Sequence, residues 1–138
     1  RFEGERFCTI LFAVLSPGPT PTVTLAGGGH PSPLVRKADG RVEEVWVGGS
    51  VLGVFEDADI GSQRVTLEPG DMLVLYTDGA IEARRDGVMF GTEGVAATIA
   101  SAPPAATPVA HAIEQAVLAH TGGTVSDDLA ALVVHAVG

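Results

Sequence analysis

The stretch Met72-Leu73-Val74-Leu75-Tyr76-Thr77-Asp78-Gly79 decides the fold, because an apolar run there ends directly in a carboxylate and a glycine. A second apolar run, residues 129–137, follows Ser126-Asp127-Asp128. Both runs are typical of buried β-strands, so each carboxylate lies at the rigid end of a strand. Carboxylate oxygens are the ligands that hard cations such as Mg²⁺ and Mn²⁺ prefer. The two stretches together indicate a metal site, if the fold aligns the two strand ends.

Length and composition are those of one globular domain. The 138 residues are enough to bury a core, and 46% of them are apolar. Seventeen acidic against eight basic residues give a net charge of −9, which disfavours a nucleic-acid partner. No apolar run approaches the roughly 20 residues that span a bilayer, and residues 1–6 resemble no secretory signal. We therefore expect a cytoplasmic protein without membrane contact. The single cysteine, Cys8, lies in an apolar run and is predicted to be a buried, inert thiol.

Apolar runs separated by Gly, Pro and Asp predict a meander of short strands followed by helices. The predicted strands are 7–15, 22–25, 34–37, 41–47, 62–67, 71–77 and 129–137. One helix is predicted over 92–101. A second is predicted from Pro108 to the glycines at 122–123, with Thr107 as its N-cap. The apolar stripe of the second helix is typical of core packing.

Strands 7–15, 72–76 and 129–137 are apolar at nearly every position. A strand with one wet face alternates apolar and polar residues, so we expect both faces of these three strands to be covered. Two helices do not cover both faces of so large a sheet. Two stacked sheets with helices outside satisfy the pattern, which predicts an α+β layered sandwich. Strand 7–15 reads as central but lies close to the start of the chain, so we expect the sandwich to be incomplete at its N-terminus.

Seven short segments form a recognisable series. In chain order they are Phe7-Cys8-Thr9, the Gly-rich segment 26–34 around His30, Leu52-Gly53-Val54, Leu67-Glu68-Pro69-Gly70-Asp71, Tyr76-Thr77-Asp78-Gly79 leading to Glu82-Ala83, Phe90-Gly91, and Asp127-Asp128-Leu129. This series resembles the C-terminal part of the PP2C-type metal-dependent serine/threonine phosphatases, above all the bacterial branch with the SpoIIE and RsbU regulators. No segment is specific alone, but their order matches over nearly the whole chain.

The resemblance implies a layered α-β-β-α sandwich of mostly antiparallel strands, with residues 1–138 as a single domain that forms the C-terminal part of a PP2C-like phosphatase domain. It implies that Asp78 and Asp127 are catalytic residues and metal ligands. Gly79 and Asp128 are assigned to the same metal site: Gly79 lets the chain turn without a Cβ that blocks the site. Asp128 contacts the metal, supports a ligand or caps the last strand. The implied cofactor is Mg²⁺ or Mn²⁺, with two ions in the intact domain.

Two plainer interpretations stay open at this point. Asp-Gly is among the commonest turn dipeptides, so Asp78 is also consistent with an ordinary turn, and Asp127 with a solvated loop. The family's Gly-Asp pair, whose aspartate bridges the two ions, has no match in residues 1–30. The chain is therefore expected to hold one half of a binuclear site.

Other polar residues receive structural interpretations. His30 lies between glycines and Pro31, which favours an architectural role over catalysis, while His111 and His120 are expected at the surface of the second helix. The acidic segment 56–59 lacks the glycine and glutamate spacing of a calcium loop and is predicted to be a solvated turn. Glu82 is close enough to the Thr-Asp-Gly motif to support the site, without an assigned role.

The leading functional hypothesis is a metal-dependent phosphatase domain that acts on phosphoserine or phosphothreonine in a protein. By analogy with the closest branch, its partner is a phosphorylated anti-sigma-factor antagonist. The alternative is a catalytically incomplete phosphatase-like module with a regulatory or interaction role. A third hypothesis is a β-rich binding domain of other ancestry, which is testable by whether the Asp78 and Asp127 oxygens lie roughly 3–5 Å apart.

Overall fold

The computed structural model describes residues 6–138, whose strands form two antiparallel sheets and a short hairpin. The three-stranded sheet has the order β1–β2–β5, with the bounds Ile10–Ser16, Thr22–Gly28 and Gly61–Thr66. The four-stranded sheet has the order β4–β3–β6–β9, with the bounds Val42–Glu44, Leu34–Arg36, Met72–Tyr76 and Ala131–His135. The hairpin pairs β7 (Arg84–Arg85) with β8 (Val88–Met89).

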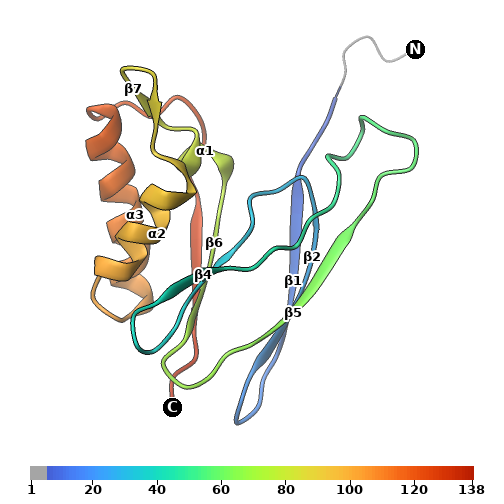
Figure 1. The fold of residues 1–138 in the computed structure, drawn as a ribbon, viewed down its shortest axis with the longest axis vertical. Helices are drawn as coiled ribbons and strands as arrows, with labels where there is room; N and C mark the ends of the chain where they lie inside the picture. The colour runs from blue at the N-terminus through green and yellow to red at the C-terminus, as the bar shows by residue number, and fades with distance from the viewer. Residues whose placement is uncertain (1–5) are drawn as a thin grey trace.

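Three helices complete this part of the chain: α1 (Asp78–Ile81), α2 (Gly91–Ser101) and α3 (Ala106–Thr121). Figure 1 shows α2 and α3 side by side on one face of the four-stranded sheet, with the three-stranded sheet on the other side. The predicted α+β class, with stacked sheets and external helices, is confirmed. Among residues 6–138, however, no helix covers the outer face of the three-stranded sheet, so the layers run α–β–β.

The core between the helices and the four-stranded sheet is the larger of two apolar clusters. From β6 it takes Met72, Val74 and Tyr76, all 3% exposed or less. Opposite them lie the fully buried helix residues Val95, Ile99, Val109, Ile113 and Val117. The apolar stripe predicted for the second helix is thus core packing. Its Gly122 has a left-handed φ of 74° and ends α3, as predicted. Thr107 was predicted as the N-cap and instead lies inside the first turn, after Ala105.

The second cluster lies between the two sheets. Because side chains alternate along a strand, Leu73 and Leu75 of β6 point away from the helices and toward β2. Leu73 packs in this cluster with Val23 and Leu25 of β2 and with Val35 of β3. The strand β6 therefore contributes to both apolar clusters. Both of its faces are covered, as predicted for the stretch 72–76.

The same expectation is wrong for β1 and holds only in part for β9, where Val133 packs in the first cluster and Val134 in the second. In β1, an edge strand, Ile10, Phe12 and Val14 are 44%, 60% and 47% exposed. They share the outer face of the three-stranded sheet, which residues 6–138 leave uncovered. The edge strand β9 likewise has Leu132 exposed to 61%. An apolar run therefore does not by itself show that both faces of a strand are covered. Cys8 is also exposed, against the prediction of a buried thiol.

A buried carboxylate holds the turn before β6. The Asp71 side chain is 1% exposed, accepts hydrogen bonds from the backbone N–H groups of Ala38 and Glu68 at 3.0 Å each, and pairs with the Lys37 ammonium. Burial alone would raise the pKa of Asp71, but the Lys37 contact and the two N–H donors outweigh it and hold the pKa below its ordinary value. This turn fixes where β6 begins.

Residues 6–138 contain no helix that is both long and apolar enough to cross a bilayer.

Candidate metal centre

The site forms where β6 and β9 end side by side. The two strands pair antiparallel from Met72↔His135 to Tyr76↔Ala131, so the residues after Tyr76 meet those before Ala131. Thr77 joins the two ends with its backbone N–H, which donates to the Ala130 carbonyl at 3.0 Å. Its hydroxyl donates to the Asp128 carbonyl and accepts from the Ala130 N–H, each at 3.0 Å. These three hydrogen bonds hold the Asp127-Asp128 segment against the start of α1.

Gly79 is required by space and not by turn geometry. A Cβ at this position would lie 2.2 Å from the Asp128 carbonyl oxygen and 2.9 Å from its carbonyl carbon. Gly79 is the second residue of α1 and is not among the glycines with positive φ. The expectation that it permits a turn is therefore corrected: it permits the close approach of two chain segments. Its part in metal binding, predicted above, remains a prediction.

Three carboxylates converge at this point. One oxygen each from Asp78, Glu82 and Asp127 can be chosen so that all lie within 4.8 Å of one another. Asp78 begins α1 and Glu82 follows four residues later, so both project from the same face of that turn. The Asp127 carboxylate is oriented by the Asp128 N–H, which donates to its Oδ1 at 2.7 Å.

The donor set fits a hard divalent cation. Metal–oxygen distances of about 2.0–2.6 Å allow two ligand oxygens on one ion to lie up to about 5 Å apart, which the cluster satisfies. All three ligands are anionic oxygens, Asp78 is half-buried, and Glu82 and Asp127 face solvent, so bound water can complete the coordination of Mg²⁺ or Mn²⁺. Asp128 is not part of this cluster; its backbone holds Thr77 and Asp127 in place.

His30 contacts the end of β6, next to the site, through its ring nitrogens. Its Nε2 lies 3.0 Å from the Tyr76 carbonyl, which only accepts, so Nε2 carries the proton. Nδ1 then accepts from the Thr9 hydroxyl at 3.1 Å. The ring thereby ties Thr9, the residue before β1, to Tyr76, the last residue of β6 and the one before Thr77. The architectural role predicted for His30 agrees with these contacts.

Burial raises the pKa of the Tyr76 phenol, which donates to the Ser32 carbonyl at 2.9 Å.

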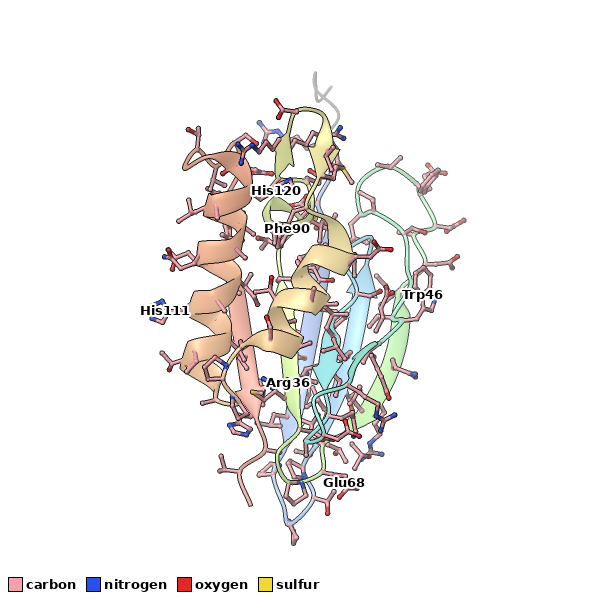
Figure 2. The ribbon with its side chains drawn as sticks, turned by 60° about the vertical axis from the view of Figure 1, so that its left-hand side comes forward. Arg36, Trp46, Glu68, Phe90, His111 and His120 are labelled. Atoms are coloured by element: carbon pink, nitrogen blue, oxygen red, sulfur yellow. The ribbon has the colours of Figure 1, made fainter. Side chains whose placement is uncertain are left out.

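The other singled-out polar residues lie away from the cluster. His111 projects from α3 into solvent, as predicted, and sits 3.7 Å from Glu114 (Figure 2). His120 was expected at the surface but is partly buried, where its Nε2 donates to the Val88 carbonyl at 2.9 Å. The acidic segment 56–59 is largely exposed, as predicted.

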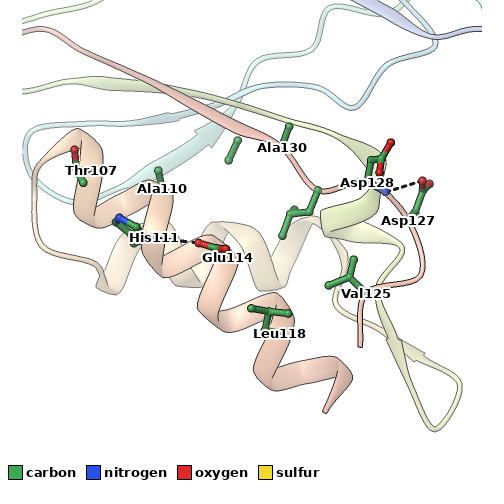
Figure 3. Close-up of a pocket in the computed structure, with 11 residues that line it drawn as sticks. Thr107, Ala110, His111, Glu114, Leu118, Val125, Asp127, Asp128 and Ala130 are labelled. Carbon is green, nitrogen blue, oxygen red and sulfur yellow. Dashed lines mark hydrogen bonds and ion pairs between the residues drawn. The ribbon is translucent and has the colours of Figure 1, made fainter. Parts of the chain in front are cut away.

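Hollows surround the carboxylates. One of about 620 Å³ runs between α3 and the start of β9; Figure 3 shows Asp127 and Asp128 at one end of it and Thr107 at the other. A second, of about 510 Å³, contains Glu82, Arg84 and Asp127. A third, of about 450 Å³, reaches from Asp78 and Glu82 to the exposed Trp46. The cluster is therefore open to a large substrate.

Sequence reasoning identified Asp78 and Asp127 but gave Glu82 no role. The available signal for Glu82 was its spacing of four residues from Asp78, which places both carboxylates on one helical face. It was weak because the helix has only four residues, Asp78–Ile81, and is too short to show a periodic pattern.

Comparison with known proteins identifies the family of this chain. Residues 1–137 match the family model of stage II sporulation protein E (SpoIIE). The chain is similar to protein IcfG of Synechocystis sp., with 24% identity over 131 residues, 94% of this chain and 20% of IcfG. The fold is similar to the SpoIIE phosphatase domain from Bacillus subtilis, with a TM-score of 0.78, 15% identity and coverage of 94% of this chain and 56% of that one.

A further solved structure contains the RsbU and RsbW domains of a Mycobacterium tuberculosis protein; its TM-score is 0.59 at 26% identity, over 86% of this chain and 37% of that one. The chain thus spans a fifth of its curated relative and about half of the first solved structure. The hypothesis of a β-rich domain with other ancestry is set aside. From its sequence match and its fold, the chain belongs to the SpoIIE family, as a PP2C-type, SpoIIE/RsbU-like domain.

Proposed function

We propose that this chain supplies one half of the metal centre of a Mg²⁺- or Mn²⁺-dependent protein phosphatase that hydrolyses phosphoserine or phosphothreonine. The observation that carries the proposal is the convergence of Asp78, Glu82 and Asp127 at the joined ends of β6 and β9. Asp78 and Asp127 are 49 residues apart in the sequence, so the fold and not the local sequence brings them together. Membership of the SpoIIE family supports the same conclusion.

Phosphomonoester hydrolysis is extremely slow without a catalyst, and bound divalent ions supply hydroxide near neutral pH and offset charge on the phosphoryl oxygens. The residues of this chain have simpler tasks. Asp78 and Asp127 bind the cation, and Glu82 binds it or a water attached to it. Thr77 and Gly79 set the spacing between Asp78 and Asp127. The exposed position of the cluster allows a phosphorylated segment of a folded protein to approach.

We further propose that the domain works in the cytoplasm and that its substrate is a phosphorylated anti-sigma-factor antagonist. The support is the similarity to the structure that contains RsbU and RsbW domains, together with the SpoIIE family match. Other similar structures belong to different settings, such as PppA, described as a regulatory component of the T6SS in Pseudomonas aeruginosa. A panel of phosphorylated antagonist proteins, with unrelated phosphoproteins as controls, tests the assignment through relative kcat/KM.

Metal binding and turnover test the central proposal. We expect the 138-residue chain to bind Mn²⁺ weakly and to hydrolyse p-nitrophenyl phosphate slowly or not at all, because residues 1–30 contain no aspartate. Extension by the residues encoded before Arg1 is expected to restore activity if they include a Gly-Asp pair. Asp78→Asn should abolish both metal binding and activity, whereas Asp57→Asn, in the exposed acidic turn, should leave both unchanged. Robust activity of the isolated chain would refute the half-site, and unchanged Mn²⁺ binding in Asp78→Asn would refute the metal centre.

A second candidate function is a phosphatase-like module without catalysis. The lack of a Gly-Asp pair in residues 1–30 is compatible with this function as well as with the half-site, and the sequence encoded before Arg1 distinguishes the two. In that case the residues encoded before Arg1 contain no such pair, and the extended protein binds its partner without dephosphorylating it.

A further inference from the structure

The hollow of about 510 Å³ beside the carboxylates contains one cation, Arg84. The hollow shares Glu82 and Asp127 with the cluster, and the polar side chains of Thr124 and Ser126 line another part of it. Among residues 6–138, Arg84 forms no ion pair with any carboxylate. Arg84, which has no ion pair among the described residues, thus lines a hollow that also contains two of the three clustered carboxylates.

The hairpin β7–β8 determines which arginine faces the hollow. Arg84 and Arg85 are consecutive residues of β7, so their side chains point to opposite sides of the hairpin. Arg84 lines the hollow and Arg85 does not. The Nε of Arg85 instead lies 4.0 Å from the Asp86 carboxylate, in solvent. The two neighbours therefore have the same charge and similar exposure but different surroundings.

Contacts with α3 hold this hairpin in position. The His120 Nε2, near the end of α3, donates to the Val88 carbonyl of β8 at 2.9 Å. The Phe90 ring packs against the His120 ring, with 5.4 Å between centroids, and Figure 2 shows both side chains where α3 meets the hairpin. Arg84 pairs with Met89 across the hairpin, so anchoring β8 also anchors the backbone of Arg84.

We propose that Arg84 binds the phosphoryl group of the substrate, so that the hollow is a phosphate subsite beside the metal centre. A guanidinium presents two N–H groups in a planar fork that matches two phosphate oxygens, and this geometry gives both charge neutralisation and orientation. The inference rests on the proposed phosphatase function. The same chemistry would bind free inorganic phosphate, the product of that reaction.

A simpler role for Arg84 would be to offset the negative charge of the three carboxylates. That role predicts different changes in Mn²⁺ and phosphate affinity when Arg84 is replaced. Removal of a cation that only offsets charge should tighten Mn²⁺ binding and change phosphate binding only slightly, because charge attraction is lost but no hydrogen bond to phosphate is lost, and lysine should replace it fully. A phosphate-binding arginine should show a large loss of phosphate affinity, with partial rescue by lysine, which keeps the charge but not the fork.

The experiment compares Arg84→Ala and Arg84→Lys with the matched control Arg85→Ala, titrating inorganic phosphate into each protein at saturating Mg²⁺ by calorimetry. We expect Arg84→Ala to weaken phosphate binding about tenfold or more, Arg84→Lys to fall between, and Arg85→Ala to stay within about twofold of the original chain. With the active, extended protein, Arg84→Ala should also raise KM for a phosphopeptide and raise the inhibition constant of phosphate.

The two proposals fail separately. Absence of metal-dependent turnover in every form of the protein would refute the phosphatase function, while the phosphate titration would still decide the role of Arg84. Equal phosphate affinities for Arg84→Ala and Arg85→Ala would overturn the subsite. Tighter Mn²⁺ binding by Arg84→Ala with only slightly changed phosphate affinity would overturn it in favour of charge compensation.

Discussion

The substitution Gly79→Ala tests whether the approach of α1 to the Asp127-Asp128 segment builds the metal centre. The added Cβ would lie 2.2 Å from the Asp128 carbonyl oxygen, well inside the 3.0 Å that real contacts respect. The opposing atoms are backbone, so no side chain can rotate away, and the two segments must separate by roughly 1 Å. Overpacking of this kind costs about 1–3 kcal/mol in the free energy of unfolding.

The same displacement separates Asp127 from Asp78, because Asp127 precedes the displaced residue directly. Ligand oxygens that now lie within 4.8 Å would move beyond the span of one ion. We expect Gly79→Ala to weaken Mn²⁺ binding at least tenfold, measured from the electron paramagnetic resonance signal of free Mn²⁺ during titration. Urea unfolding in EDTA measures the stability change without a contribution from the metal.

The matched control is Gly18→Ala, because a Cβ there meets nothing within 4 Å and the backbone φ is not positive. This control should match the original protein in both assays. If Gly79→Ala bound Mn²⁺ within twofold of the original chain and unfolded at the same urea concentration, the close approach would have no part in forming the site.

Three further predictions concern Thr77 beside the site, Asp71 at the other end of β6 and Phe12 on the outer face of β1. Thr77→Val keeps the shape but removes the hydroxyl that bonds Asp128 and Ala130, so it should cost about 1–3 kcal/mol in urea unfolding and weaken Mn²⁺ binding, with recovery in Thr77→Ser. Asp71→Asn should cost about 1–3 kcal/mol at pH 7, again by urea unfolding. Because folding lowers the pKa of Asp71, the contribution of its carboxylate to stability is complete above the ordinary pKa near 3.9 and is lost as pH falls through the pKa of the folded state. The unfolding free energies of Asp71→Asn and the original protein should therefore converge from pH 7 through pH 4 to pH 3. A difference that stays constant over this range would contradict the Lys37–Asp71 ion pair. Phe12→Lys, on the exposed face of β1, should change stability by no more than about 0.5 kcal/mol but reduce self-association in light scattering; equal association would show that this face is not adhesive.

The order of the main strands and the two long helices was predictable because apolar runs and Gly/Pro turns are local signals. The predicted strand 62–67 corresponds to β5 at Gly61–Thr66, and the helix predicted over 92–101 begins one residue earlier. The four-residue α1 and the hairpin β7–β8 were not predicted, since elements of two to four residues show no periodicity. The exposure of Phe12 could not be predicted either, because it depends on which layers are present and not on the strand itself.

The candidate site was predictable only where family resemblance supplied long-range information. Asp78 and Asp127 are 49 residues apart, and their proximity depends on the β6–β9 register from Met72↔His135 to Tyr76↔Ala131. Glu82 needed the knowledge that Asp78 begins a helical turn. The requirement for glycine at position 79 depends on a contact with Asp128 that no local pattern encodes.

The double role of β6 has a consequence for how the cation ligands move. This strand is hydrogen-bonded to a neighbour on each side and packed on both faces, so its amide protons should exchange with solvent more slowly than those of the edge strands β1 and β9. Asp78 is attached to the end of that slowest-opening segment, whereas Asp127 belongs to the solvent-exposed connection between α3 and β9. Asp78 therefore depends for its position on the strand core, whereas Asp127 depends on the hydrogen bonds of Thr77 and Asp128, so loss of those bonds should displace Asp127 and leave Asp78 in place.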